Sequence, residues 1–266
     1  MYKLIALDID GTLLTTDHKI SELTRRTITE VSDTGIPVVI CTGRAIQGVE
    51  PIIDELNLDL PFITYNGAMI LMGKSKELLF EQKLSKEDAI DIYQLGQHYD
   101  TTIILWNHNK LYVNKLNERA TKYGKAANTE PIVIQDIVEV VKDGATKLLW
   151  YDDVKTISKF ESSVLNQIGD TINYHTSKPF YLEFVDYRAS KALALKRLGQ
   201  KLNIKQHEMI AVGDGFNDLS MIKYAGLGVA MGNASRVIKE AADYVTYSND
   251  QDGIAQVINK FVFNRS

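Results

Sequence analysis

The sequence predicts an α/β fold: a doubly wound, mostly parallel, Rossmann-like sheet with a smaller α+β domain inserted into it. Two observations lead to this prediction. At both ends of the chain, short apolar runs alternate with amphipathic, helix-like segments, the pattern of a parallel sheet covered by helices. In the middle, paired strand-like runs with fewer helices replace this alternation. We therefore expect residues 1–82 and 187–266 to form one core and residues 83–186 an inserted α+β cap domain.

The first half of the core shows its elements in order. Leu4–Ile9 is an apolar run interrupted by Asp8, as expected of a buried parallel strand. Ser21 can cap a helix, and Gly35 can end it. The residues expected on the buried face of this helix are Leu23, Thr27, Ile28 and Val31. The next elements expected are a strand at Pro37–Cys41, a helix carrying Ile46, Val49, Ile53 and Leu56 that kinks or starts late at Pro51, and a strand at Phe62–Tyr65.

The middle of the chain has a different pattern of predicted helices and strands. Asp88–His98 is a candidate helix, and Asn107-His108-Asn109 is a turn signal between two strand-like runs, Thr101–Trp106 and Lys110–Val113. Further strands are expected at Lys147–Tyr151, Thr171–Tyr174 and Phe180–Val185. His175, Ser177 and Lys178 form a polar turn that is a candidate for contact with a ligand.

After Ser190 the α/β alternation resumes. The elements expected are the helix Lys191–Leu202, the strand Met209–Val212, a short helix, the strand Leu227–Met231, the helix Ser235–Ala242, the strand Tyr244–Thr246 and a last helix over Ile254–Phe261. Strands from both ends of the chain thus contribute to one sheet.

Composition excludes several classes of protein. The 30 basic and 34 acidic residues give a net charge of −4, and nothing in this balance indicates a nucleic-acid or membrane surface. The single cysteine, Cys41, cannot form a disulfide within the chain, so a cytoplasmic location is expected. The N-terminal residues run directly into a strand, so no signal peptide is expected.

Polar residues occur where three predicted strands end. The first strand is followed by Asp8-Ile9-Asp10-Gly11-Thr12, the second by Thr42-Gly43, and a later one by Gly213-Asp214-Gly215-Phe216-Asn217-Asp218. Lys191 opens a helix beside them. The carboxyl ends of parallel strands are where α/β folds place their sites, so we expect these residues to share one site.

These residue types suit phosphoryl transfer, which needs a nucleophile, neutralised phosphate charge and a proton for the leaving oxygen. Several carboxylates at one rim repel each other unless a hard cation lies among them, and Mg²⁺ prefers carboxylate oxygens. Asp8 can attack as a carboxylate, and Lys191 can supply positive charge. Asp10 points to the other face of an ideal strand, but Gly11 lets the chain turn so that both carboxylates serve one site.

The motifs resemble those of the haloacid dehalogenase (HAD) superfamily of phosphohydrolases. Asp8–Leu14 is similar to its first motif, and Thr42, Lys191 and Gly213–Asp218 are similar to the second, third and fourth. The insertion between the second and third motifs resembles the type-two cap of the Cof-like sugar-phosphate phosphatases. Three further stretches also resemble this subgroup: Tyr65–Ala68, Phe180–Glu183 and Ala230–Ala234. Covering essentially the whole chain, the resemblance implies a Mg²⁺-dependent phosphatase that forms an aspartyl-phosphate and acts on small phosphorylated metabolites, above all sugar phosphates.

The resemblance also implies a role for each motif residue. Asp8 would be nucleophile and metal ligand, and Asp10 the general acid and base, with its backbone carbonyl on the metal. Asp214 would bind Mg²⁺ directly, supported by Asp218 through water or hydrogen bonds. The residues expected to hold the phosphate are Ile9 through its N–H, Thr42, Gly43, Lys191 and Asn217. Ala192 stands where many relatives have glycine, from which we expect only a small change in helix packing.

Two other functions share parts of this pattern. A phosphomutase of the phosphomannomutase type needs extra basic residues on its cap, whereas the segment 83–186 contains Arg119 as its single arginine. A phosphorylatable receiver-like switch also uses acids, a threonine and a lysine. An acid two residues after the nucleophile, as Asp10 is, speeds hydrolysis where a switch needs persistence. The partner expected is therefore a small phosphate ester, with neither nucleic acid nor membrane.

Overall fold

The computed structural model describes residues 1–57, 59–163 and 167–265. By its internal contacts the chain forms two compact units. The core unit comprises Met1–Gly43, Ile52–Leu79 and Ser190–Ser266, and the inserted unit comprises Arg44–Pro51 and Phe80–Ala189. The domain limits expected from the sequence, near residues 83 and 186, stay a prediction.

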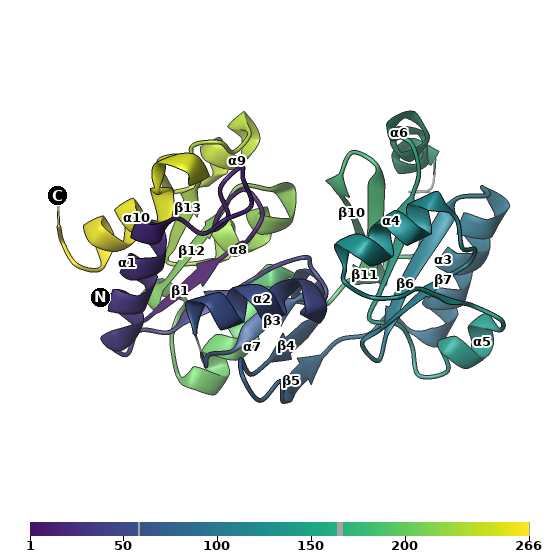
Figure 1. The fold of residues 1–266 in the computed structure, drawn as a ribbon, viewed down its shortest axis with the longest axis horizontal. Helices are drawn as coiled ribbons and strands as arrows, with labels where there is room; N and C mark the ends of the chain where they lie inside the picture. Colours follow the sequence, from purple (N-terminus) through teal and green to yellow (C-terminus); the bar gives the residue numbers. More distant parts are fainter. Residues whose placement is uncertain (58, 164–166, 266) are drawn as a thin grey trace. The chain divides into compact units, whose positions relative to one another are not determined.

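The main sheet of the core unit joins strands from both ends of the chain (Figure 1). Its strands are β1 (Leu4–Leu7), β2 (Val38–Ile40), β12 (Met209–Gly213), β13 (Leu227–Ala230) and β14 (Tyr244–Val245). They lie in the order β14-β13-β12-β1-β2, and every neighbouring pair is parallel. All residues of β1, β2 and β12 are buried, as expected of strands covered on both faces. The predicted α/β fold class is confirmed.

Helices alternate with these strands along the chain. They are α1 (Glu22–Asp33), α2 (Ile46–Leu56), α7 (Lys191–Leu202), α8 (Leu219–Tyr224), α9 (Arg236–Ala241) and α10 (Gly253–Phe261). The hydroxyl of Ser21 accepts a hydrogen bond from the Thr24 N–H at 3.0 Å and so begins α1, as predicted. Leu23, expected on the buried face of α1, is half exposed, and Thr24 is buried in its place. The helix α2 does not start late, because it includes Pro51.

The third predicted strand belongs to a second, smaller sheet. The strands β3 (Phe62–Thr64), β4 (Met69–Leu71) and β5 (Leu78–Glu81) lie in the order β3-β4-β5, with β3 antiparallel to β4. An isolated bridge between Cys41 and Ile63 links β3 to the end of β2. The 3₁₀ turn Tyr65–Gly67 reverses the chain between β3 and β4.

The inserted unit has a mixed sheet of its own. Its strands are β6 (Thr102–Asn107), β7 (Lys110–Val113), β8 (Ile132–Val133), β9 (Lys147–Tyr151), β10 (Ile172–Lys178) and β11 (Tyr181–Asp186), in the order β10-β11-β9-β6-β7-β8. Its helices are α3 (Lys86–His98), α4 (Glu118–Ala126), α5 (Ile137–Val140) and α6 (Val154–Ser163). The predicted hairpin joins β6 to β7, with positive φ at His108 and Asn109. One face of the sheet contributes Leu105, Leu148, Trp150, Leu182 and Phe184 to the core of this unit.

A membrane span would need a longer and more apolar helix than any formed by the residues that the structure describes.

Candidate active site

The order of the strands explains why the motif residues come together. The chain leaves β1 toward β2 and leaves β12 toward β13, in opposite directions along the sheet. The pair β1–β12 is therefore the topological switch point, where open α/β sheets bind their ligands beyond the carboxyl ends of the strands. Asp8 directly follows β1 and Asp214 directly follows β12, so both lie at this point.

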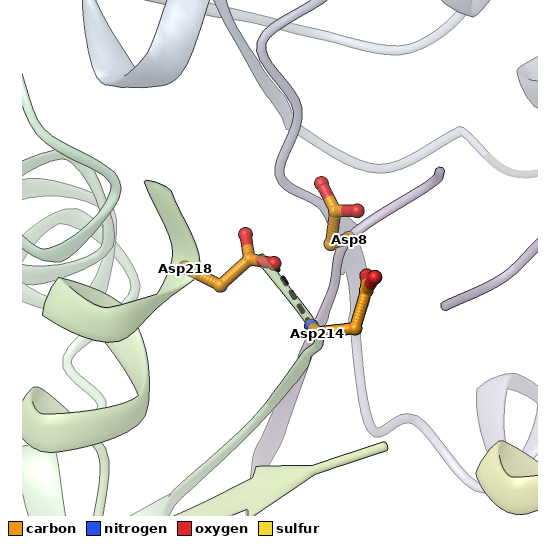
Figure 2. Close-up of side chains that lie close together, drawn as sticks. All are labelled: Asp8, Asp214 and Asp218. Carbon is orange, nitrogen blue, oxygen red and sulfur yellow. Dashed lines mark hydrogen bonds between the residues drawn. The ribbon is translucent and has the colours of Figure 1, made fainter. Parts of the chain in front are cut away.

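Three carboxylates gather there. Asp8, Asp214 and Asp218 each offer an oxygen, and these oxygens lie within 4.8 Å of one another. Figure 2 shows the carboxylate of Asp214 directed toward Asp8. One oxygen of Asp218 accepts the backbone N–H groups of Asp214 at 3.0 Å and Gly215 at 2.9 Å. Asp218 therefore fixes the turn that presents Asp214 to the site.

Lys191 connects these acids. Its side chain is fully buried, and its Nζ lies 2.5 Å from Oδ1 of Asp8 and 2.5 Å from Oδ1 of Asp218. The position of Lys191 is set by the start of α7, where the hydroxyl of Ser190 accepts the Leu193 N–H at 3.2 Å. The first, third and fourth motifs thus meet at one ammonium group.

The charges of the site do not balance. Burial and the neighbouring Asp218 raise the pKa of Asp8 well above its usual value, although Lys191 opposes this. Burial and Asp218 also raise the pKa of Asp214 to about 6. Burial alone would lower the pKa of Lys191, but Asp218 and Asp8 raise it, so Lys191 stays protonated. Carboxylates with raised pKa values, whose oxygens lie this close together, fit a hard divalent cation such as Mg²⁺.

The predicted phosphate-binding residues lie on the segments that follow β1, β2 and β12 and at the start of α7. Thr42 is buried just beyond β2, and Ile9 is buried between Asp8 and Asp10. The amide of Asn217 donates to Oδ1 of Asn66 at 3.1 Å. Asp10 is exposed, and its carboxylate is not part of the three-acid group found among the described residues.

Further polar residues hold the segment that follows Asp8. The hydroxyl of Thr12 donates to Oδ1 of Asp214 at 2.9 Å. The amide of Asn233 donates to the carbonyl of Gly11 at 2.8 Å, and that of Asn249 donates to the carbonyl of Leu14 at 2.8 Å. Thr12 and Asn233 lie in stretches that resemble the family's motifs, but the sequence analysis assigned no role to either residue. Nothing in the sequence around Asn249 indicated its contact.

The polar turn predicted at His175, Ser177 and Lys178 is wrong, because the strand β10 continues through Lys178 and pairs with β11. Two of these side chains contact a buried acid of β11. The hydroxyl of Ser177 donates to Oε1 of Glu183 at 2.6 Å, and Nε2 of His175 lies 3.3 Å from Oε2 of Glu183. Lys147 places its Nζ 2.6 Å from the same carboxylate. Lys178 instead lies over the ring of Tyr181.

Comparisons with known proteins identify the family of the chain. Residues 5–258 match the haloacid dehalogenase-like hydrolase family, and the chain belongs to that family. It is 36% identical to YxeH of Bacillus subtilis, over 98% of this chain and 99% of that protein. It is 34% identical to the 5-amino-6-(5-phospho-D-ribitylamino)uracil phosphatase YcsE of Bacillus subtilis, over 98% of this chain and 96% of that protein. The crystal structure of a haloacid dehalogenase-like hydrolase from Bacteroides thetaiotaomicron matches with a TM-score of 0.86 and 34% identity, over 98% of this chain and 99% of that one.

The chain is accordingly a phosphatase of the HAD type that acts on phosphorylated substrates. The predicted membership in this superfamily, in its Cof-like branch, and the predicted enzyme class are confirmed.

Proposed function

We propose that this phosphatase requires Mg²⁺ and hydrolyses phosphate monoesters of small polyhydroxylated metabolites, sugar phosphates above all, through a phosphorylated Asp8. The observation that carries the proposal is the pairing of Asp8 with the buried Lys191 inside a group of carboxylates. A receiver-like switch or a phosphomutase would also use such a group. The phosphatase named among the relatives favours hydrolysis.

In the first step, a carboxylate oxygen of Asp8 attacks phosphorus, and the bond from phosphorus to the ester oxygen breaks. Asp10 gives its proton to that leaving oxygen, so the alcohol departs neutral. In the second step, water attacks the aspartyl-phosphate, and Asp10 takes a proton from the water. Inorganic phosphate leaves, and the Asp8 carboxylate is restored. Lys191 holds the attacking carboxylate in place through its 2.5 Å contact.

The residues that would hold Mg²⁺ are Asp8, Asp214, Asp218 and the backbone carbonyl of Asp10. The ion would supply positive charge against the substrate phosphate and the crowded acids. The phosphate itself would be held by the N–H of Ile9, by Thr42, Gly43 and Lys191, and by Asn217.

Two arguments bear on the substrate class. The substrate in the name of the relative YcsE carries its phosphate on a ribityl group, a sugar-derived polyol. The motif residues bind the phosphoryl group common to all such esters. Selection among them must therefore come from other residues, and we assign it to the inserted segment 83–186.

Replacing Asp8 by Asn tests the mechanism. We expect Asp8→Asn to abolish phosphate release and to retain the circular dichroism of the parent, because asparagine keeps the shape but is a poor nucleophile. Asp33→Asn, at an exposed acid at the end of α1, is the matched control and should keep parental activity. Mass spectrometry of acid-quenched parent enzyme should find phosphate on the peptide that contains Asp8. Turnover by Asp8→Asn within tenfold of the parent would rule out the covalent mechanism.

A further inference from the structure

The turn between β3 and β4 has an unusual backbone. Tyr65, Asn66 and Gly67 all have positive φ, at 50°, 57° and 100°. Asparagine and glycine adopt such values with little strain, but a bulky residue such as tyrosine seldom does. Residues in sparsely populated conformations persist only where the surroundings impose them, and they cluster at functional sites.

This turn is buried, which sets it apart from an ordinary hairpin turn. Tyr65 is 1% exposed and Asn66 is 4% exposed. The hairpin between β6 and β7 has a similar backbone at His108 and Asn109, with φ of 49° and 56°, but there both side chains are exposed. A tight chain reversal therefore explains the positive φ values but not the burial of the Asn66 amide.

The buried amide of Asn66 lies between two of the proposed phosphate-binding segments. Its Oδ1 accepts a hydrogen bond from the amide of Asn217 at 3.1 Å. A Cβ atom added to Gly43 would lie 2.7 Å from the same Oδ1, so Asn66 fills the space beside Gly43. The backbone N–H of Asn66 donates to the carbonyl of Thr42 at 3.0 Å, which anchors the turn to the second motif.

The same turn also meets the third motif. A Cβ atom on Gly67 would collide with the backbone carbonyl of Ser190, the residue that caps α7 immediately before Lys191. The strained turn is therefore packed against the second, third and fourth motifs at once, and its one amide side chain contacts the fourth directly.

We propose that Asn66 is a positioning residue for the phosphate site: it orients the amide of Asn217 and braces the backbone at Gly43. The inference rests on the proposed function, since it takes Thr42, Gly43 and Asn217 as phosphate-binding residues. Asn66 would then affect the phosphoryl group, which all substrates share, and not the leaving group. Its loss should weaken binding of inorganic phosphate and leave the preference between aryl and alkyl esters unchanged.

The test compares Asn66→Gly with Asn203→Gly. Glycine keeps the left-handed backbone available at both positions, and Asn203 is an exposed αL residue, with φ of 56°, that caps the end of α7. We expect Asn66→Gly to raise the inhibition constant of inorganic phosphate about tenfold, the effect of one lost buried hydrogen bond with a stranded partner. Asn203→Gly should leave this constant unchanged. The ratio of kcat/KM for nitrophenyl phosphate to that for an alkyl phosphate should stay as in the parent.

A double mutant separates positioning from general damage. If Asn66 acts through Asn217, adding Asn66→Gly to Asn217→Ala should change the inhibition constant much less than it does in the parent. A second variant, Asn66→Asp, keeps the acceptor oxygen and tolerates positive φ, but its negative charge should raise the constant further than Asn66→Gly does. An unchanged constant in Asn66→Gly, or full additivity with Asn217→Ala, would overturn the inference. Failure of the proposed function would look different, since the parent itself would then neither hydrolyse nitrophenyl phosphate nor bind inorganic phosphate in calorimetry.

Discussion

Replacing Glu183 by Gln should destabilise the inserted unit strongly. The side chains of Glu183 and Lys147 are 6% and 3% exposed, and their charged atoms are 2.6 Å apart. The variant would leave the ammonium of Lys147 buried without its carboxylate. Removing one partner of a buried ion pair typically costs about 3–5 kcal/mol, and we expect a loss of stability in this range.

The chain provides its own probe for this measurement. Its two tryptophans, Trp106 and Trp150, lie on β6 and β9 of the inserted unit, so tryptophan fluorescence during urea unfolding reports on this unit. The matched control is Asp100→Asn, which breaks the exposed pair of Asp100 and Lys115 in the same unit. Since exposed pairs contribute little, this control should unfold almost as the parent does. Equal stability of Glu183→Gln and Asp100→Asn would refute the reasoning.

The pH dependence gives a second check. Burial by itself would raise the pKa of Glu183, but Lys147 and His175 lower it below its ordinary value. A depressed carboxylate pKa stabilises the folded state fully above the unfolded-state pKa of about 4.3. That contribution is lost as the pH falls through the lower folded-state pKa. The difference in stability between parent and Glu183→Gln should therefore be large at neutral pH and should narrow in acid, whereas a constant difference would contradict this assignment.

The remaining predictions concern the proposed chemistry. Asp10→Asn should slow hydrolysis of alkyl phosphates by ~10²–10⁴ and that of nitrophenyl phosphate less, because nitrophenolate leaves without a proton; equal losses would exclude Asp10 as the acid for the leaving group. Asp214→Ala should weaken Mg²⁺ binding in calorimetry, and a chelator should stop turnover of the parent; unchanged Mg²⁺ affinity would remove Asp214 from the metal site. Replacing segment 83–186 by a short linker should keep some hydrolysis of aryl phosphates and lose discrimination among sugar phosphates. An unchanged ranking of kcat/KM would place specificity in the core.

Elements with strong local signals were predictable from the sequence. The strand Lys147–Tyr151 and the helix Lys191–Leu202 have the predicted bounds, since an apolar run defines the first and the cap Ser190 starts the second. The helix α4 was missed because it is mostly polar, and only Ala120 and Gly124 are buried on it. The helix α6 carried a usable signal, the buried pair Ile157 and Phe160 at a spacing of three.

The contents of the site were more predictable than its connections. Carboxylates and a lysine at strand ends indicate phosphoryl transfer because few residue types perform that chemistry. The contact of Lys191 with Asp8 was expected, whereas its contact with Asp218 depends on the packing of α7 beside the end of β12, which no local pattern encodes. The role of Asn66 was hidden for a related reason. An Asn-Gly pair is an ordinary turn signal, and it does not indicate that this turn is buried or that the Asn66 amide accepts a hydrogen bond from Asn217.

The two buried lysines among the residues that the structure describes help to explain the site. Lys147 and Lys191 both lie against carboxylates in the protein interior. Glu183, beside Lys147, has a lowered pKa, because Lys147 and His175 outweigh the effect of burial. Asp8, beside Lys191, has a raised pKa, because burial and the charge of Asp218 outweigh the effect of Lys191, which also contacts Asp218. At Lys147, one carboxylate faces the ammonium and the imidazole of His175, and this group can stabilise the fold. At Lys191, two carboxylates face one ammonium, so negative charge is in excess. That surplus of negative charge is a physical reason to expect a divalent cation at the candidate active site, and it supports the proposed requirement for Mg²⁺.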